Sequence, residues 1–115
     1  MRAFVIALAL PLILPAIASA DEIRIDFPGV AVEEMHVSYE CGTHILPVRY
    51  LNAAGTSLAV FNIDGERIVA SAGPSGSGTR YVGGRYVWWT KGSEATLYDE
   101  MAGEDSPPLL TCAAT

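Results

Sequence analysis

The sequence predicts an all-β domain, an antiparallel barrel or sandwich of seven or eight short strands. After residue 20, the apolar segments are short and rich in β-branched and aromatic residues, and Gly, Asn, Asp, Pro or Ser separates each from the next. None of these segments shows the apolar period of a helix. Closure of such a sheet into a barrel makes physical sense because it removes exposed strand edges.

The expected strands run from residue 35 to residue 112. They cover Met35–Cys41, Ile45–Leu51, Leu58–Ile63, Arg67–Ala72, Arg80–Val82, Arg85–Thr90, Ala95–Tyr98 and Leu109–Cys112. Turn signals separate them: residues 52–55 predict a turn, Asp64-Gly65 is a strong two-residue hairpin signal, and Gly83-Gly84 predicts another tight hairpin. Pro107-Pro108 must precede the last strand, because proline cannot donate a hydrogen bond to a ladder.

Residues 1–20 have the features of an export signal. Arg2 precedes an apolar run over residues 3–17, and Ala18-Ser19-Ala20 is a small-x-small cleavage signal. The run is short for a transmembrane anchor and two prolines interrupt it. We therefore expect cleavage after Ala20 and a periplasmic product without a stable membrane anchor. No cysteine follows the run to accept a lipid.

Residues 21–34 separate the export signal from the predicted domain at residues 35–115. Apolar residues in this segment alternate with Arg24 and Asp26, as on a half-buried strand, until Pro28-Gly29 breaks the pattern. We expect the segment to form an N-terminal arm or an extra strand, and residues 35–115 to form the barrel.

The chain is acidic and small. Its 115 residues include 13 acidic and 7 basic side chains, for a net charge of −6, and loss of Arg2 with the export signal makes the remainder more acidic. Nucleic-acid binding is excluded because phosphate contacts need a Lys/Arg surface. The length leaves little room for a dinucleotide fold, whose βαβ units need about 30 residues each. We expect no cofactor, and a homo-oligomer stays possible.

Cys41 and Cys112 both follow the export signal. An oxidising compartment favours their pairing in a disulfide, which would pin the first core strand to the last. The alternative is a metal site that combines a cysteine with His36 and His44. These residues lack a recognised ligand spacing, so we expect no metal.

The segment Gly73–Thr79 superficially resembles a phosphate-binding loop. It lacks the lysine after its last glycine, and Arg80–Val82 predicts a strand where that loop needs a helix. Neither Ser75 nor Ser77 has glycines two residues before and two residues after it, as a nucleophile elbow requires, and no base, nucleophile or metal constellation emerges, so we expect no enzyme. The segment does offer a hydroxyl: Ser77 lies between two glycines, where little side-chain bulk hinders entry into a narrow cleft.

Two linked motifs are more specific. Ser77–Tyr81 reads Ser-Gly-Thr-Arg-Tyr, and Lys91–Leu97 begins at the only lysine and reads Lys-Gly-Ser-Glu-Ala-Thr-Leu. In order and spacing they resemble the Ser-Gly-x-x-Tyr and Lys-Gly-x-x-Ala-x-Leu patterns of the membrane-bound or periplasmic inhibitors of C-type lysozyme. Tyr39–Cys41 and Leu110–Cys112 match the residues at the start and at the end of the domain in that family. The resemblance covers residues 37–112.

The resemblance implies an eight-stranded antiparallel β-barrel with one disulfide, and a loop that enters the active-site cleft of C-type lysozyme. The implied lysozyme-binding residues are Ser77, Gly78, Thr79, Tyr81, Lys91 and Gly92. The Ser77 hydroxyl would bond a catalytic carboxyl group, Lys91 would supply positive charge, and Tyr81 would support the loop or pack at its rim. Family members are lipoproteins or soluble periplasmic proteins, and the missing lipid-acceptor cysteine places this chain in the second group.

Two other functions stay open. A small barrel can hold a ligand, which would make the protein a small-ligand carrier, although two tryptophans and five tyrosines predict a filled interior. The protein could also be a non-catalytic cell-envelope adaptor that uses residues 21–34 as its contact. The paired motifs favour lysozyme inhibition, and because C-type lysozymes are usually basic, an acidic chain would be steered towards them.

Overall fold

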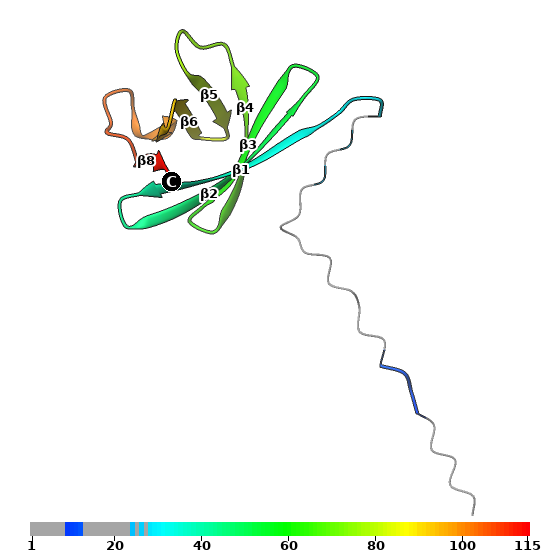
Figure 1. Ribbon diagram of the computed structural model, residues 1–115. Helices are drawn as coiled ribbons and strands as arrows, with labels where there is room; N and C mark the ends of the chain where they lie inside the picture. Colours follow the sequence, from blue (N-terminus) through cyan, green and yellow to red (C-terminus); the bar gives the residue numbers. More distant parts are fainter. Residues whose placement is uncertain (1–8, 13–23, 25, 27) are drawn as a thin grey trace, which may run out of the picture.

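The computed structural model describes residues 9–12, 24, 26 and 28–115. Eight antiparallel strands form a closed barrel in which each strand pairs with the next along the chain and the last pairs with the first (Figure 1). The strands are β1 (Glu33–Cys41), β2 (His44–Ala53), β3 (Thr56–Ile63), β4 (Glu66–Gly73), β5 (Thr79–Gly83), β6 (Tyr86–Lys91), β7 (Glu94–Asp99) and β8 (Leu110–Ala114). The expected eight-stranded all-β barrel with a disulfide is confirmed.

Strand boundaries differ from the sequence prediction by one or two residues. The β5–β6 turn is Gly84-Arg85 rather than Gly83-Gly84, so β6 begins at Tyr86. One element was not predicted, the single 3₁₀ turn η1 (Glu100–Ala102) after β7. An element of one turn is too short to show an apolar period, which is why the sequence pattern did not reveal it.

The first strand begins at Glu33, two residues before the predicted start of the domain. Residues 28–32 precede it without strand pairing, and the apolar positions of the predicted arm or extra strand, residues 23, 25 and 27, lie outside the described residues. Most of the predicted export signal lies outside them as well. Within the described part of the chain, no helix has the length and apolar character needed to cross a membrane.

The seam between β1 and β8 closes the barrel with few backbone contacts. Its ladder holds two residue pairs, at Tyr39 and Glu40 of β1, whereas β1 pairs with β2 along its whole length. The Cys41–Cys112 disulfide joins the same two strands. The covalent link therefore lies where the hydrogen-bonded sheet is weakest.

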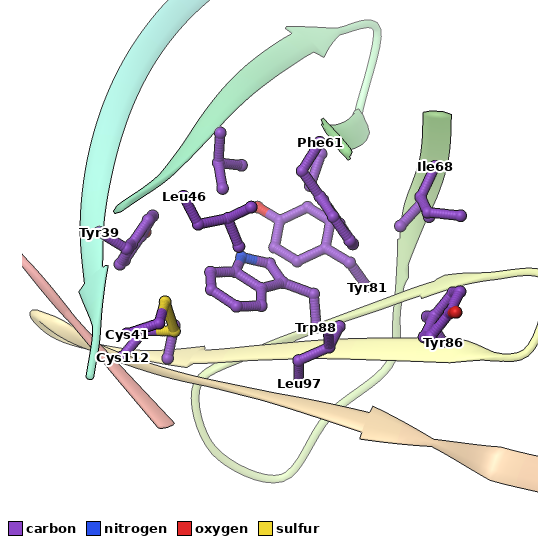
Figure 2. Packing of buried hydrophobic residues seen from close by; sticks show 14 of the residues in the cluster. Tyr39, Cys41, Leu46, Phe61, Ile68, Tyr81, Tyr86, Trp88, Leu97 and Cys112 are labelled. Carbon is purple, nitrogen blue, oxygen red and sulfur yellow. A yellow bond between two sulfur atoms is a disulfide. The ribbon is translucent and has the colours of Figure 1, made fainter. Parts of the chain in front are cut away.

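An aromatic cluster with internal hydrogen bonds fills the interior (Figure 2). Trp88 is fully buried, and its Nε1–H donates to the Tyr50 hydroxyl at 2.9 Å. The hydroxyls of Tyr50 and Tyr39 share a hydrogen bond of 2.7 Å, and burial raises the pKa of Tyr50. The Trp88 ring packs edge-on against Tyr39 at a centroid distance of 5.1 Å and tilted against Phe61 at 5.6 Å. The interior is thus occupied by side chains from four strands, which connects opposite walls of the barrel.

Removal of the disulfide should cost much of the stability of the domain. The link spans 71 residues, for which the chain-entropy model gives about 4 kcal/mol. We expect the Cys41→Ala/Cys112→Ala double variant to lose about that much free energy of unfolding in urea, followed by tryptophan fluorescence. Circular dichroism in buffer checks that the variant is folded. Equal unfolding midpoints for variant and oxidised parent would contradict a stabilising link at the seam.

Tyr50→Phe should destabilise the protein more than Tyr39→Phe. Loss of the Tyr50 hydroxyl leaves the Trp88 indole and the Tyr39 hydroxyl without a partner in the core. Loss of the Tyr39 hydroxyl leaves Tyr50 still accepting from Trp88. We expect about 1–3 kcal/mol for Tyr50→Phe and a smaller loss for the control, from urea unfolding of both variants. Equal losses would mean that the Trp88 hydrogen bond contributes nothing.

Candidate functional site

The topology brings the two sequence motifs to one end of the barrel. In an up-and-down barrel alternate turns lie at the same end, so the β4–β5 loop and the β6–β7 turn are neighbours. The β4–β5 loop, residues 74–78, projects from the barrel and carries Ser77 (Figure 1). Lys91 is the last residue of β6, and Gly92 forms the turn that follows.

Gly78 allows the loop to pack against the end of β6. Its φ is +67°, and a Cβ at this position would lie 2.3 Å from the carbonyl oxygen of Thr90 and 2.7 Å from Cγ of Lys91. Such distances are shorter than real Cβ atoms show, so only glycine fits without movement of the neighbours. The loop backbone therefore lies directly on the stem of Lys91.

The carbonyl oxygen of Ser77 accepts two hydrogen bonds. Trp89 Nε1–H donates at 2.9 Å, and the Ser75 hydroxyl donates at 2.7 Å. The side chain of Ser77 is exposed, and in the described part of the chain its hydroxyl has no hydrogen-bond partner. The structure thus fixes the backbone of Ser77 and leaves its hydroxyl available to a ligand.

Trp89 also contacts the lysine. The Nζ of Lys91 lies 5.2 Å from the centroid of the Trp89 ring, a cation–π arrangement. Because side chains alternate along a strand, Trp89 and Lys91 share the outer face of β6, while Trp88, which precedes Trp89, points into the core. A single indole ring therefore contacts both the residue that carries the hydroxyl and the ammonium group.

The remaining predicted residues lie below this surface or in its turns. Gly92 has a φ of +57° in the β6–β7 turn. Thr79 is half-buried at the start of β5. Tyr81 is only 7% exposed and packs against Tyr50 at a centroid distance of 5.6 Å, and burial raises the pKa of its phenol. Tyr81 is thus part of the core that supports the strand leading out of the loop.

Trp89 and Ser75, which donate hydrogen bonds to the Ser77 carbonyl, are not among the site residues predicted from the sequence. For Trp89 a signal existed, because the period of two in a strand places it on the same face as Lys91. For Ser75 no signal existed, because its hydrogen bond depends on the conformation of the loop.

The described residues do not assemble a metal site. They contain no group of three or more His, Cys, Asp or Glu side chains placed to hold an ion. Cys41 is bound in the disulfide, and Nε2 of His36 lies 2.8 Å from a carboxylate oxygen of Glu34. Arg49 also donates to Glu34 and holds the pKa of that carboxyl group below its usual range.

Two acidic residues at the end of β7 far from Lys91 are paired with arginines. Arg85 donates to both carboxylate oxygens of Asp99, at 2.9 Å and 2.6 Å, and these bonds hold the pKa of Asp99 below its usual range. Nη2 of Arg80 donates to Glu100 at 3.1 Å. Arginines therefore neutralise two carboxylates on this wall of the barrel, whereas the acidic residue that the register places opposite Lys91 is Glu94.

Residues 39–106 match the protein family described as "Membrane-bound lysozyme-inhibitor of c-type lysozyme". Two relatives named membrane-bound lysozyme inhibitor of C-type lysozyme match over most of their length. The relative from Cupriavidus necator is 44% identical over 111 residues, which cover 90% of this chain and 86% of the relative. The relative from Pseudomonas aeruginosa is 36% identical over 114 residues, which cover 90% of each chain.

Solved structures agree in fold. Pseudomonas aeruginosa MliC, crystallised in complex with hen egg white lysozyme, superposes with a TM-score of 0.67 at 35% identity, over 85% of this chain and 100% of that chain. The periplasmic inhibitor PliC from Salmonella typhimurium superposes with a TM-score of 0.61 at 26% identity, over 72% of this chain and 99% of that chain. These neighbours are inhibitors of C-type lysozyme.

Gly78→Ala should displace the loop from β6. The added methyl group meets the Thr90 carbonyl, and the left-handed backbone conformation alone costs a residue with a Cβ about 1–2 kcal/mol. We expect a shifted Trp89 indole N–H resonance in NMR spectra and lower stability in urea. Gly76→Ala is the matched control, because that position has open space and an ordinary φ. An unchanged Trp89 resonance in Gly78→Ala would refute the close packing of the loop.

Proposed function

Because the chain belongs to the family of membrane-bound lysozyme inhibitors of C-type lysozyme, we propose that it inhibits a C-type lysozyme by inserting the Ser77 loop and Lys91 into the active-site cleft. One observation carries this proposal. The packing of Gly78 on the stem of Lys91 holds an exposed hydroxyl and an exposed ammonium group together at the end of the barrel.

The chemistry of the enzyme suits these two groups. Lysozyme cleaves glycosidic bonds with two carboxyl groups, one protonated at rest and one ionised. In the proposed complex Ser77 Oγ–H donates to one carboxyl group, and the ammonium of Lys91 pairs with the carboxylate. Charge-assisted hydrogen bonds are among the stronger polar contacts. The inhibitor performs no chemistry of its own and acts by occupying the cleft.

Preorganisation of the loop supports tight binding. The two hydrogen bonds to the Ser77 carbonyl are already made, so little backbone freedom remains to be lost on association. Lys91 exchanges its contact with Trp89, worth about 0.5–1 kcal/mol at an exposed site, for a pair with a carboxylate.

The other predicted site residues have supporting roles in this proposal. Gly78 and Gly92 keep side-chain bulk away from the path into the cleft. Thr79 contacts the cleft entrance at the base of the loop, and Tyr81 supports the loop from inside the barrel.

The charge and the compartment suit the same partner. An acidic protein of net charge −6 attracts a basic enzyme at long range, which raises the association rate and weakens with salt. We propose a periplasmic protein that is cleaved after Ala20 and carries no lipid. The relatives are named membrane-bound or periplasmic inhibitors, which supports a location in the cell envelope.

Ser77→Ala and Lys91→Ala should each weaken inhibition of lysozyme. Loss of one partner of a buried charge-assisted contact lowers affinity by at least about 30-fold. The test is a lysozyme turbidity assay with protein beginning at Asp21, titrated to an equimolar ratio and beyond. Lys91→Arg should retain part of the inhibition because it keeps the positive charge.

Thr43→Ala is the control, since it removes an exposed hydroxyl from the β1–β2 turn at the opposite end of the barrel. Full inhibition by both Ser77→Ala and Lys91→Ala would move the inhibitory surface elsewhere. No inhibition of any C-type lysozyme by the folded, oxidised parent would overturn the proposed function.

A further inference from the structure

A groove on the outer wall of the barrel begins at Trp89, beside the proposed inhibitory site, and extends towards the far end of β7. Trp89 of β6 and Tyr98 of β7 line it, and Val87, which is 2% exposed, lies at its base. The connection between β7 and β8 supplies the opposite wall, with Glu100 and Glu104. This connection covers Val87 although the side chain points away from the barrel interior.

The groove is preformed. The connection is attached to the barrel at both ends, because the N–H of Glu100 donates to the carbonyl of Arg85 at 2.8 Å and the N–H of Leu109 donates to the carbonyl of Leu97 at 2.7 Å. Within the connection, the hydroxyl of Ser106 donates to the carbonyl of Ala102. A cation that enters the groove would therefore meet walls that are already in place.

The charge in the groove favours a cationic occupant. Asp99, Glu100, Glu104 and Arg80 line it. Asp99 is paired with Arg85, and Glu100 is paired with Arg80. Glu104 is exposed and forms no ion pair within the described residues, which leaves one uncompensated carboxylate in a groove that two aromatic side chains also line. Ring faces and a carboxylate together suit a guanidinium or ammonium group.

The position of the groove indicates which molecule carries this cation. Trp89 lines the groove, and the same indole binds the Ser77 carbonyl and the ammonium of Lys91. A protein that covers Ser77 and Lys91 therefore also reaches the groove.

We propose that the groove is a second contact for the lysozyme, and that it receives an arginine or lysine side chain of the enzyme body between the aromatic wall and Glu104. This inference rests on the proposed function. The inserted loop blocks the cleft, and the groove fixes the rotation of the inhibitor on the enzyme. A basic enzyme thus meets carboxylates at the groove and a lysine at its acidic cleft.

The test compares Glu104→Lys with Asp105→Lys. Both change the net charge by the same amount in the same exposed connection, but only Glu104 lines the groove. Association and dissociation rates with hen egg white lysozyme are measured by surface plasmon resonance at low and at physiological salt. Circular dichroism confirms that both variants are folded.

Both reversals should slow association to a similar extent at low salt, because steering depends on total charge. Only Glu104→Lys should also speed dissociation, by about tenfold, because it removes a short-range contact. Equal dissociation rates for the two variants, with tight binding by the parent, would overturn the proposed contact at the groove and leave the proposed function standing. A parent that neither binds nor inhibits lysozyme would overturn the proposed function and the groove together.

Discussion

The closure of the barrel at the seam between β1 and β8 is the constraint on which the rest of the structure depends. The seam ladder contains two residue pairs, so the sheet by itself closes weakly there. The Cys41–Cys112 disulfide ties the two strands covalently, and the hydrogen bonds among Tyr39, Tyr50 and Trp88 tie β1 to β2 and β6 across the interior. An open seam would expose two strand edges and admit water to the aromatic core.

The packing of the core also orients the surface side chains of β6. Trp88 points inward and is locked in the core, so its neighbour Trp89 must point outward, where it binds the Ser77 carbonyl and the ammonium of Lys91. Gly78 completes the arrangement by letting the loop approach β6 without a steric clash. The hydrophobic interior therefore fixes the proposed inhibitory surface, although none of the polar groups of that surface is buried there.

Charge is separated along this surface. Lys91 places a positive charge at the tip of an acidic protein, where an acidic cleft would meet it. The carboxylates lie along the neighbouring wall, and Arg80 and Arg85 neutralise two of them. Glu104 stays uncompensated at the groove. The proposed binding to a basic enzyme with an acidic active site needs both signs at different places, and β6 together with the β7–β8 connection supplies that arrangement.

The sequence by itself determined the features that depend on residues close together in the chain. Short apolar segments and the turn signals between them predicted the strands and their order, and Asp64-Gly65 forms the expected turn with φ values of 49° and 78°. Two cysteines in a chain expected to be exported predicted the disulfide, and two spaced motifs predicted the family. Only the tertiary structure decided that Trp89 holds the Ser77 carbonyl and that the β7–β8 connection builds a groove beside it. Those contacts depend on the register between strands, which core packing and barrel closure set together and which no local pattern encodes.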